Sequence, residues 1–375
     1  MEDLPESLLA EIVKRITRRC DLNSLSLVSK QLYTIDANQK GTLRATCGHR
    51  LIEKHCFCSR INDSGLGYLV YCKKLMSLRL NSVRKITSNG LLSVVVGCKN
   101  LSALHLTDCD KIDSEGWLEY LGLNGSLEEL AVNNCEGISH HDLLKFGPGW
   151  MKLQKFMFEM KDGFWDAFSQ GRKGFDPSYD AHNPSTYDFC CESLKDLRLA
   201  HITFGPEIGL RVLLGKCKAL ERLWLEYVNG LNDNDMIALS RSCSNLRSIS
   251  LCLTPQFYDY SCRTSFTDDS LKALALSCPM LQAVELTFYD CDPCWPSEIG
   301  FTLEGLLVVI QSCPVSVLVL NGANFFNDEG MEAILSAPFL ETLELVDCVA
   351  ITDAGMRFVA YTPCLTNLTL GCVTK

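Results

Sequence analysis

The chain has 375 residues with 45 acidic and 35 basic side chains, so its formal net charge of −10 gives no general attraction to nucleic acid or anionic membranes. Its hydrophobic content of 47% is typical of a folded globular protein, and no apolar run approaches the roughly 20 residues that cross a bilayer. The N-terminal segment MEDLPESLLAEI carries acids where a secretory leader carries basic residues, which predicts a cytoplasmic or nuclear protein.

The first elements in chain order are helices within residues 1–44. Apolar residues at helical spacing predict one helix, and Asp21 stands at the N-cap position of a second. The apolar positions are Leu8, Leu9, Ile12 and Ile16 in the first helix and Leu22, Leu25 and Val28 in the second. This pattern predicts a small helical bundle with more leucines than its own core needs, which favours a hydrophobic interface with another protein.

The rest of the chain repeats the motif LxxLxL eleven times, once a residue short. Its first leucine recurs every 26 residues from Leu75 to Leu153 and again from Leu194 to Leu246. Several copies continue with a polar N-cap residue and apolar residues at helical spacing, as in KITSNGLLSVVVGC from Lys85. Such a repeat holds one strand and one helix, neither of which buries its apolar face alone.

The predicted fold class is therefore α/β, with a helical domain at 1–44, a linker at 45–57 and a solenoid at 58–375. Stacked repeats align their strands into a parallel sheet with about 4.8 Å between strands. Because strands are narrower than helices, we expect a right-handed, horseshoe-shaped solenoid with a concave sheet and convex helices.

Eleven of the 21 cysteines occupy fixed repeat positions. Seven open the strand motif (Cys72, Cys98, Cys191, Cys217, Cys243, Cys278 and Cys313), and four precede the isoleucine of the turn (Cys58, Cys109, Cys135 and Cys348). A small, weakly polar side chain packs well there, so we expect buried free thiols, and the odd total also disfavours a disulfide framework. The pattern resembles the cysteine-containing subfamily of leucine-rich repeats over residues 58–375.

The N-terminal string also resembles an F-box: Leu-Pro, then LLxxI, then DLxxLxxVSK, although Leu32 stands where that family often has Trp. With these repeats behind it, the chain is similar to the F-box/leucine-rich-repeat proteins, in particular those of plants. The resemblance implies a non-catalytic substrate receptor of an SCF-type ubiquitin ligase. Its F-box would dock on the Skp adaptor and through it on cullin and RING subunits, and its repeats would hold a protein substrate for ubiquitination and proteasomal degradation. The implied adaptor-binding residues are Leu4, Pro5, Leu8, Leu9, Ile12, Leu22, Leu25 and Val28.

Strand side chains alternate, so the residue between the last two leucines of each motif faces the open side of the sheet. A tryptophan there is costly unless a partner covers it, which makes Trp224 the predicted substrate anchor, with Arg198 one repeat away. The substrate-binding residues predicted from this face and from the first long insertion are Arg79, His105, Met157, Arg198, Arg222, Trp224, Glu226, Glu285, Phe164 and Trp165.

Three repeats are overlong, with insertions within 159–190, 252–266 and 287–301. Long loops on a rigid scaffold commonly carry binding sites, and the first insertion is rich in aromatic residues. In plant hormone receptors of the resembled family such loops help to form a small-molecule pocket, so a ligand is one option. The other is that the aromatic side chains fold back over the rim of the solenoid.

The second and third insertions hold Cys252, Cys262, Cys291 and Cys294, whose thiolates could form a structural zinc site. The spacing of the first pair is unusual for zinc, so no cofactor is predicted. No GxxxxGK[ST], HExxH or GxSxG motif is present. Two other functions stay open: a repeat scaffold or inhibitor that binds a partner without ubiquitination, and an enzyme dependent on metal or thiol.

The final LTLGCVTK lacks a polar capping repeat, which predicts a shortened form or an end covered by a partner.

Overall fold

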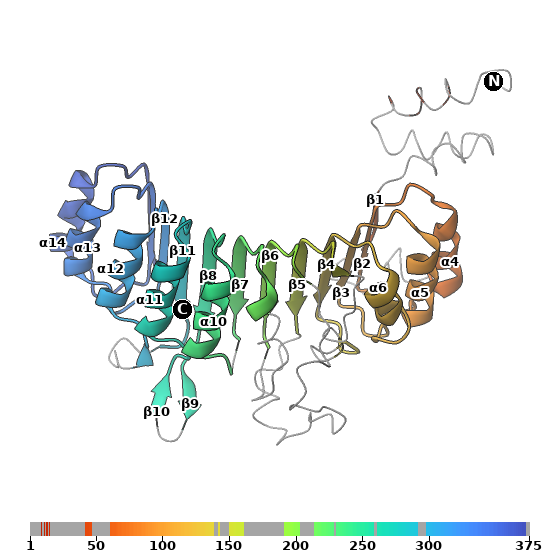
Figure 1. Ribbon diagram of the computed structural model, residues 1–375, viewed down its shortest axis with the longest axis horizontal. Helices are drawn as coiled ribbons and strands as arrows, with labels where there is room; N and C mark the ends of the chain where they lie inside the picture. The colour runs from red at the N-terminus through yellow and green to blue at the C-terminus, as the bar shows by residue number, and fades with distance from the viewer. Residues whose placement is uncertain are drawn as a thin grey trace. The chain divides into compact units, whose positions relative to one another are not determined.

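A computed structural model describes residues 9, 11, 13, 15, 42–46, 61–138, 142, 150–160, 191–202, 214–228, 230–258, 261–291 and 298–372, with the backbone alone at 42–46, 256–258 and 261–262. The chain divides into two compact units, residues 1–150 and residues 151–375 (Figure 1). None of the helices described is long and apolar enough to cross a membrane.

The first unit contains a parallel sheet in sequence order. Its strands are β1 (Thr42–Thr46), β2 (Ser77–Asn81), β3 (Ala103–Thr107) and β4 (Glu129–Asn133). Its helices are α4 (Asp63–Gly67), α5 (Ser88–Gly97) and α6 (Trp117–Asn124), with the 3-10 helix η1 at Tyr68–Tyr71. Helix α5 packs against both α4 and α6. Each strand is thus joined to the next by a helical crossover, as the repeat predicted.

Strand β1 corrects the predicted boundaries. The predicted helical domain ends at residue 44 and the predicted linker spans 45–57, but Thr42–Thr46 pairs in parallel with β2, with Arg44 opposite Arg79. The segment TLRAT has the β-branched residues that strands favour but lacks the LxxLxL signature, so the repeat search missed it. The sheet therefore begins before residue 58.

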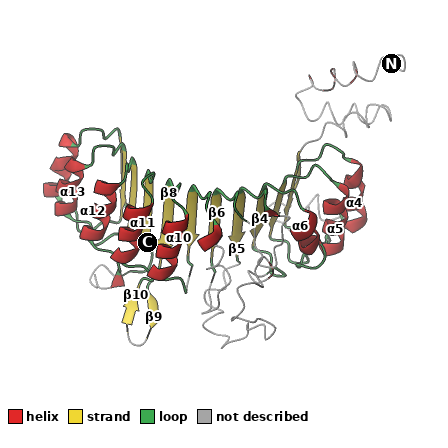
Figure 2. Ribbon diagram, in the orientation of Figure 1, coloured by secondary structure: helices red, strands yellow, loops and turns green. Residues whose placement is uncertain are grey.

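The second unit continues the same alternation of strand and helix. Its parallel strands are β5 (Lys155–Glu159), β6 (Asp196–Ala200), β7 (Arg222–Glu226), β8 (Ser248–Leu253), β11 (Ala283–Phe288), β12 (Val317–Asn321), β13 (Thr342–Val346) and β14 (Asn367–Gly371). Its helices are α10 (Asp233–Ser242), α11 (Asp268–Ser277), α12 (Leu303–Ser312), α13 (Asp328–Ala333) and α14 (Asp353–Met356), with the 3-10 helices η5 (Ile334–Ser336) and η6 (Arg357–Tyr361). Figure 2 shows α10 to α13 side by side along one face of the sheet, where each contacts the next.

All eleven predicted strands are present, and their leucines form the core. The inward residues of β2, such as Leu78 and Leu80, are fully buried, as are their counterparts up to β13. In β14, Leu368 and Leu370 are exposed, because that strand has a neighbour in the sheet on one side only. The predicted insertion within 252–266 contains an antiparallel hairpin, β9 (Gln256–Tyr258) and β10 (Ser261–Arg263).

The repeat cysteines are free thiols that pack between the repeats. Among those described, all are buried except Cys72 and Cys348, which are half-buried, while Cys58 lies outside the described residues. Cys243 donates to the Cys217 carbonyl oxygen at 2.8 Å, and the Sγ atoms of Cys191 and Cys217 lie 3.6 Å apart. Burial raises the pKa of Cys243 and of Cys278 to about 12, so these thiols stay protonated. The prediction of structural, unpaired cysteines is confirmed for the described ones.

Neighbouring repeats are also joined by a recurring contact, which we call the carboxylate staple. In it, an aspartate in the first turn of one helix accepts hydrogen bonds from the backbone N–H and the hydroxyl of the threonine that caps the next helix. In the described part of the chain this contact occurs four times, with distances between 2.6 and 2.8 Å, at Asp63–Thr87, Asp233–Thr267, Asp268–Thr302 and Asp328–Thr352. Each satisfies an N-terminal N–H of the next helix and fixes the spacing between two repeats.

Candidate functional site

The open face of the sheet carries the column of side chains predicted from strand alternation. In residues 1–150 it reads Arg79, His105 and Ala131, and in residues 151–375 it reads Met157, Arg198, Trp224, Ser250, Glu285, Val319, Glu344 and Thr369. This register is confirmed. Binding of a substrate by these residues stays a prediction.

Two arginines on β6 and β7 share one carboxylate. Asp196 is the first residue of β6, and its side chain is only 9% exposed. Its carboxylate oxygens accept hydrogen bonds from Arg198 Nε at 3.3 Å and from Arg222 Nε at 3.1 Å. The arginine side chains themselves are 46% and 47% exposed. One buried carboxylate therefore fixes two cations, and the three groups together keep a net positive charge. Such a fixed pair is suited to bind an anionic side chain, because less conformational entropy is lost on binding.

Trp224 lies beside this arginine pair. It is opposite Arg198 across the β6–β7 pairing and opposite Ser250 across the β7–β8 pairing. Because residues two apart on a strand face the same side, Arg222, Trp224 and Glu226 line one face of β7. The Trp224 side chain is half-buried, so part of its ring remains accessible on the open face. The structure thus brings Arg198, Arg222 and Trp224 together, as the sequence predicted, and adds Asp196, which the sequence analysis did not single out.

In the first unit, the predicted residues of the open face are more enclosed. His105 is half-buried, and its Nε2 lies 3.5 Å from Glu129 Oε1 on the adjacent strand. Arg79 is half-buried as well, and its Nε is a buried donor that meets no acceptor among the described residues. These side chains offer less surface to a partner than the arginines of β6 and β7.

A stack of three aromatic rings at the carboxyl ends of β6, β7 and β11 was not predicted from the sequence. His201 and Tyr227 directly follow β6 and β7 with φ of 55° and 48°, and their rings stack with centroids 5.0 Å apart and planes at 17°. Tyr289 follows β11, and its ring stacks on Tyr227 at 5.5 Å and 22°. Repeat position alone does not indicate this stack, because β8 lies between β7 and β11 and Tyr289 is one residue beyond Phe288, which the sheet register aligns with Leu253.

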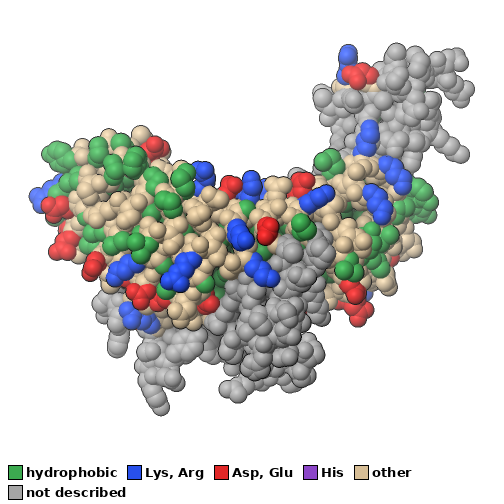
Figure 3. Space-filling model, viewed as in Figure 1, with side chains coloured by type: hydrophobic (Ala, Val, Ile, Leu, Met, Phe, Trp, Pro, Cys, Tyr) green, Lys and Arg blue, Asp and Glu red, His purple; other side chains and the backbone are tan. Residues whose placement is uncertain are grey.

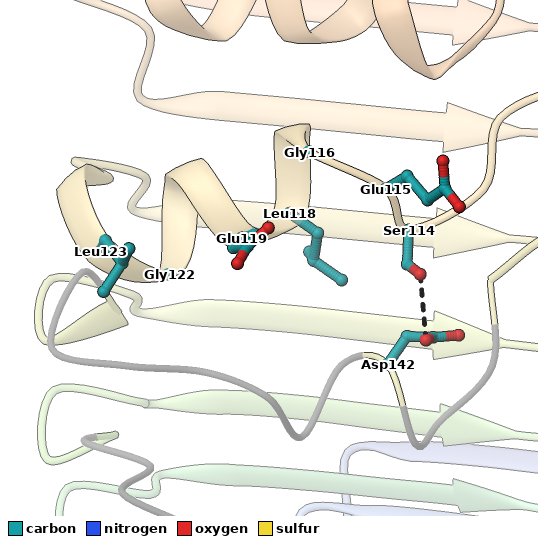
Figure 4. A pocket seen from close by; sticks show the side chains of 8 residues that line it. All are labelled: Ser114, Glu115, Gly116, Leu118, Glu119, Gly122, Leu123 and Asp142. Carbon is teal, nitrogen blue, oxygen red and sulfur yellow. Dashed lines mark hydrogen bonds between the residues drawn. The ribbon is translucent and has the colours of Figure 1, made fainter. Parts of the chain in front are cut away.

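The helical side of the first unit contains a cavity of about 420 Å³ beside α6. Figure 4 shows its lining, in which Ser114 donates to Asp142 Oδ1 at 3.0 Å and Glu115 and Glu119 add two more carboxylates. Among the described residues no other charged group lines it, and no set of three or more potential metal ligands is assembled. This cavity therefore stays without an assigned role.

Several predicted residues fall outside the description. Of the adaptor-binding residues only Leu9 is described, and it is helical and 3% exposed, so in this chain its side chain is not available on the surface. Phe164 and Trp165 lie outside the described residues. So do Cys294 and the side chain of Cys262, which leaves the zinc site untested, while Cys252 is a buried free thiol and Cys291 a half-buried one.

The charges on the surface are mixed. On the face in Figure 3, acidic and basic side chains both occur among the described residues. This agrees with the net charge of −10.

Comparison with known proteins finds matches in both parts of the chain. A model of the F-box domain matches residues 1–35, and a model of the leucine-rich repeat matches residues 97–117 and 336–360. A chain in the crystal structure of the Rad7 and Elc1 complex in yeast is similar over 98% of this chain and 80% of its own length, with 18% identity and a TM-score of 0.55. The internalin InlF of Listeria monocytogenes matches over 92% of both chains, with 15% identity and a TM-score of 0.46. The similarity to the yeast chain shows a shared fold.

Proposed function

Because the chain carries an N-terminal F-box followed by leucine-rich repeats, we propose that it is the substrate-recognition subunit of an SCF-type ubiquitin ligase. The F-box docks on an Skp-type adaptor, which links it to cullin and RING subunits. The repeats bind a protein substrate, which the assembled ligase ubiquitinates for degradation by the proteasome. The chain itself supplies recognition and no catalysis, and it acts in the cytoplasm or the nucleus.

The observation that supports substrate binding by the repeats is the pre-organised group on β6 and β7. Asp196 holds Arg198 and Arg222 in place beside the half-buried ring of Trp224, on the face of the sheet opposite the buried leucines. Tryptophan and arginine dominate binding energies at protein interfaces, and a buried carboxylate that fixes two arginines lowers the entropic cost of engaging a partner. We infer that an acidic segment of the substrate docks here.

Association with the adaptor tests the first half of the proposal. The chain is co-expressed with an Skp-type adaptor, and the complex is measured by size-exclusion chromatography. Leu8→Asp is expected to weaken association at least about tenfold, because a charge in an apolar interface costs more than about 1.4 kcal/mol. Leu276→Asp is the matched control, since Leu276 on α11 is 86% exposed. Leu9 is not used, because its burial would confuse docking with folding. If wild type does not associate, or if Leu8→Asp associates equally well, the ligase proposal fails.

Substrate transfer tests the second half. Proteins captured by the wild-type chain with the proteasome blocked are compared with those captured by Trp224→Ala and by the control Tyr361→Ala, whose exposed ring lies on η6. We expect Trp224→Ala to lose the substrate while keeping the adaptor, and the captured protein to be ubiquitinated when the other ligase subunits are added. A partner that stays bound and unmodified would favour the scaffold alternative.

A further inference from the structure

The stacked rings of Tyr227 and Tyr289, which we call the tyrosine platform, flank strand β8. The Tyr227 N–H donates to the Cys252 carbonyl oxygen at 3.1 Å, and the Tyr289 N–H donates to the Leu253 carbonyl oxygen at 2.9 Å. The two rings therefore approach β8 from opposite sides and meet face to face at 5.5 Å. Backbone hydrogen bonds at both ends of the stack hold its geometry, and His201 extends it behind Tyr227.

The Cys252 side chain shows how closely the platform packs on the sheet. Its register places it opposite Glu226 on one side and Thr287 on the other, a position on the open face. Its thiol is nevertheless buried, and the Tyr227 side chain lies in hydrogen-bond contact with it. Tyr289, in contrast, is 42% exposed, so an aromatic surface remains accessible on the platform.

The charges around the platform are negative. Burial raises the pKa of Tyr227 and of Tyr289, and the carboxylate of Glu226 raises both further, while Asp290 also acts on Tyr227. Both hydroxyls therefore stay neutral at physiological pH, and the potential at the rings favours a cation over an anion. An aromatic face already has a negative quadrupole, so the carboxylates and the rings attract the same kind of ligand.

We propose that the tyrosine platform binds an arginine side chain of the protein substrate, with its guanidinium stacked on Tyr289 and attracted by Glu226 and Asp290. Arginine fits better than lysine, because its planar group stacks on an aromatic ring while its N–H groups remain directed at carboxylates. This inference rests on the proposed function, since it describes a second contact made by the same substrate.

The platform and the arginine pair lie at opposite ends of the same strands. Arg222 opens β7 and Tyr227 follows its last residue, so the two sites are about 16 Å apart along the strand at roughly 3.3 Å per residue. Crossing β8 toward Tyr289 adds a sideways step of about 5–10 Å. An extended peptide covers that separation in about five to six residues. The inferred substrate segment therefore has an acidic residue and an arginine at about that spacing.

The test is a titration of the full chain, in complex with its adaptor, with the capped peptides Gly-Gly-Arg-Gly-Gly, Gly-Gly-Lys-Gly-Gly and Gly-Gly-Gln-Gly-Gly, followed by NMR. The arginine peptide is expected to bind saturably with a Kd on the order of 1 mM, and the glutamine peptide at least about fivefold more weakly. No saturable binding of the arginine peptide up to about 10 mM would overturn the proposal, as would equal binding of the glutamine or lysine peptide.

Variants assign the binding to the platform. Tyr289→Leu is expected to weaken the arginine peptide about fivefold, while Tyr289→Phe retains the ring and the affinity. Asp290→Asn removes a charge from a residue with φ of 56°, a conformation that asparagine tolerates, and is expected to weaken binding about threefold. Asp108→Asn, at φ of 50° after β3, is the matched control and leaves binding unchanged.

Unchanged affinity in both Tyr289→Leu and Asp290→Asn would show that the peptide binds elsewhere. Because the readout is direct binding, its failure leaves adaptor association and ubiquitination intact. Loss of adaptor association with peptide binding retained would remove only the ligase function.

Discussion

Replacing Gly305 by alanine changes stability in two ways, through the helix propensity of α12 and through the contact of this helix with the neighbouring repeat. Gly305 lies in the first turn of α12, where its N–H donates to the Thr302 hydroxyl oxygen. In the carboxylate staple, Asp268 accepts from the Thr302 N–H at 2.8 Å and from the Thr302 hydroxyl at 2.6 Å. A Cβ at Gly305 would overlap the Asp268 carboxylate, so the aspartate side chain must leave the staple.

The two effects of the substitution have opposite signs. Alanine in a helix is more stable than glycine by about 1 kcal/mol. Displacing the carboxylate removes two hydrogen bonds to a charged acceptor, each of which stabilises a protein by about 1.5–3 kcal/mol when buried. Because this staple is exposed to solvent, we expect the loss of both bonds together to cost about 2–3 kcal/mol. Gly305→Ala should therefore lower the free energy of unfolding by about 1–2 kcal/mol, whereas helix propensity alone predicts an increase.

Urea unfolding followed by circular dichroism measures this change. Gly67→Ala is the matched control, since Gly67 has a helical φ of −57° and open space around it, so alanine there should be neutral or stabilise by up to about 1 kcal/mol. In an Asp268→Ala background the overlap with the carboxylate is gone and only a close approach of 3.0 Å to the Cβ of residue 268 remains, so Gly305→Ala should cost clearly less than in the wild-type chain. A stabilising Gly305→Ala in the wild-type chain, or an equal cost with and without Asp268, would show that the carboxylate staple does not oppose a side chain at residue 305.

Three further predictions follow from contacts described above. Hydrogen bonds from Thr352 lower the pKa of Asp328 in the folded chain. The stability that this staple contributes is therefore present above the pKa of the unfolded chain and is lost as pH falls through the lower pKa of the folded chain. Urea midpoints measured from pH 7 to pH 3 should fall less steeply for Asp328→Asn than for wild type. The pKa of Cys278 is raised to about 12, so this thiol should resist iodoacetamide at pH 8 until the chain is unfolded. The exposed Cys364 should be alkylated in the native state. A mass spectrum in which Cys278 is labelled before Cys364 would contradict this prediction. Asp196→Ala releases Arg198 and Arg222, so it should weaken substrate capture several-fold with little effect on adaptor association, and undiminished capture would show that their fixed position is unimportant.

The sequence predicted what depends on short-range periodicity. Alternation along each strand placed Arg198 and Trp224 on the open face, and the 26-residue spacing put them opposite one another. The same regularity separated the buried repeat cysteines from thiols available for chemistry. It did not predict β1, because TLRAT lacks the leucines of the motif and becomes a strand by pairing with β2.

Only the tertiary structure determined which side chains meet across repeats. Asp196 holds an arginine 26 residues away, and Asp268 reaches Thr302 34 residues away, through contacts that depend on the rotamer and the exact stacking of two layers. Between Tyr227 and Tyr289 the chain forms two helices, two strands and a hairpin, so no local pattern brings their rings together. Leu9 was predicted to face the adaptor but is buried in its own chain. Periodicity in a sequence fixes the face and the layer of a residue, whereas its partners depend on packing between layers, which a one-dimensional pattern does not contain.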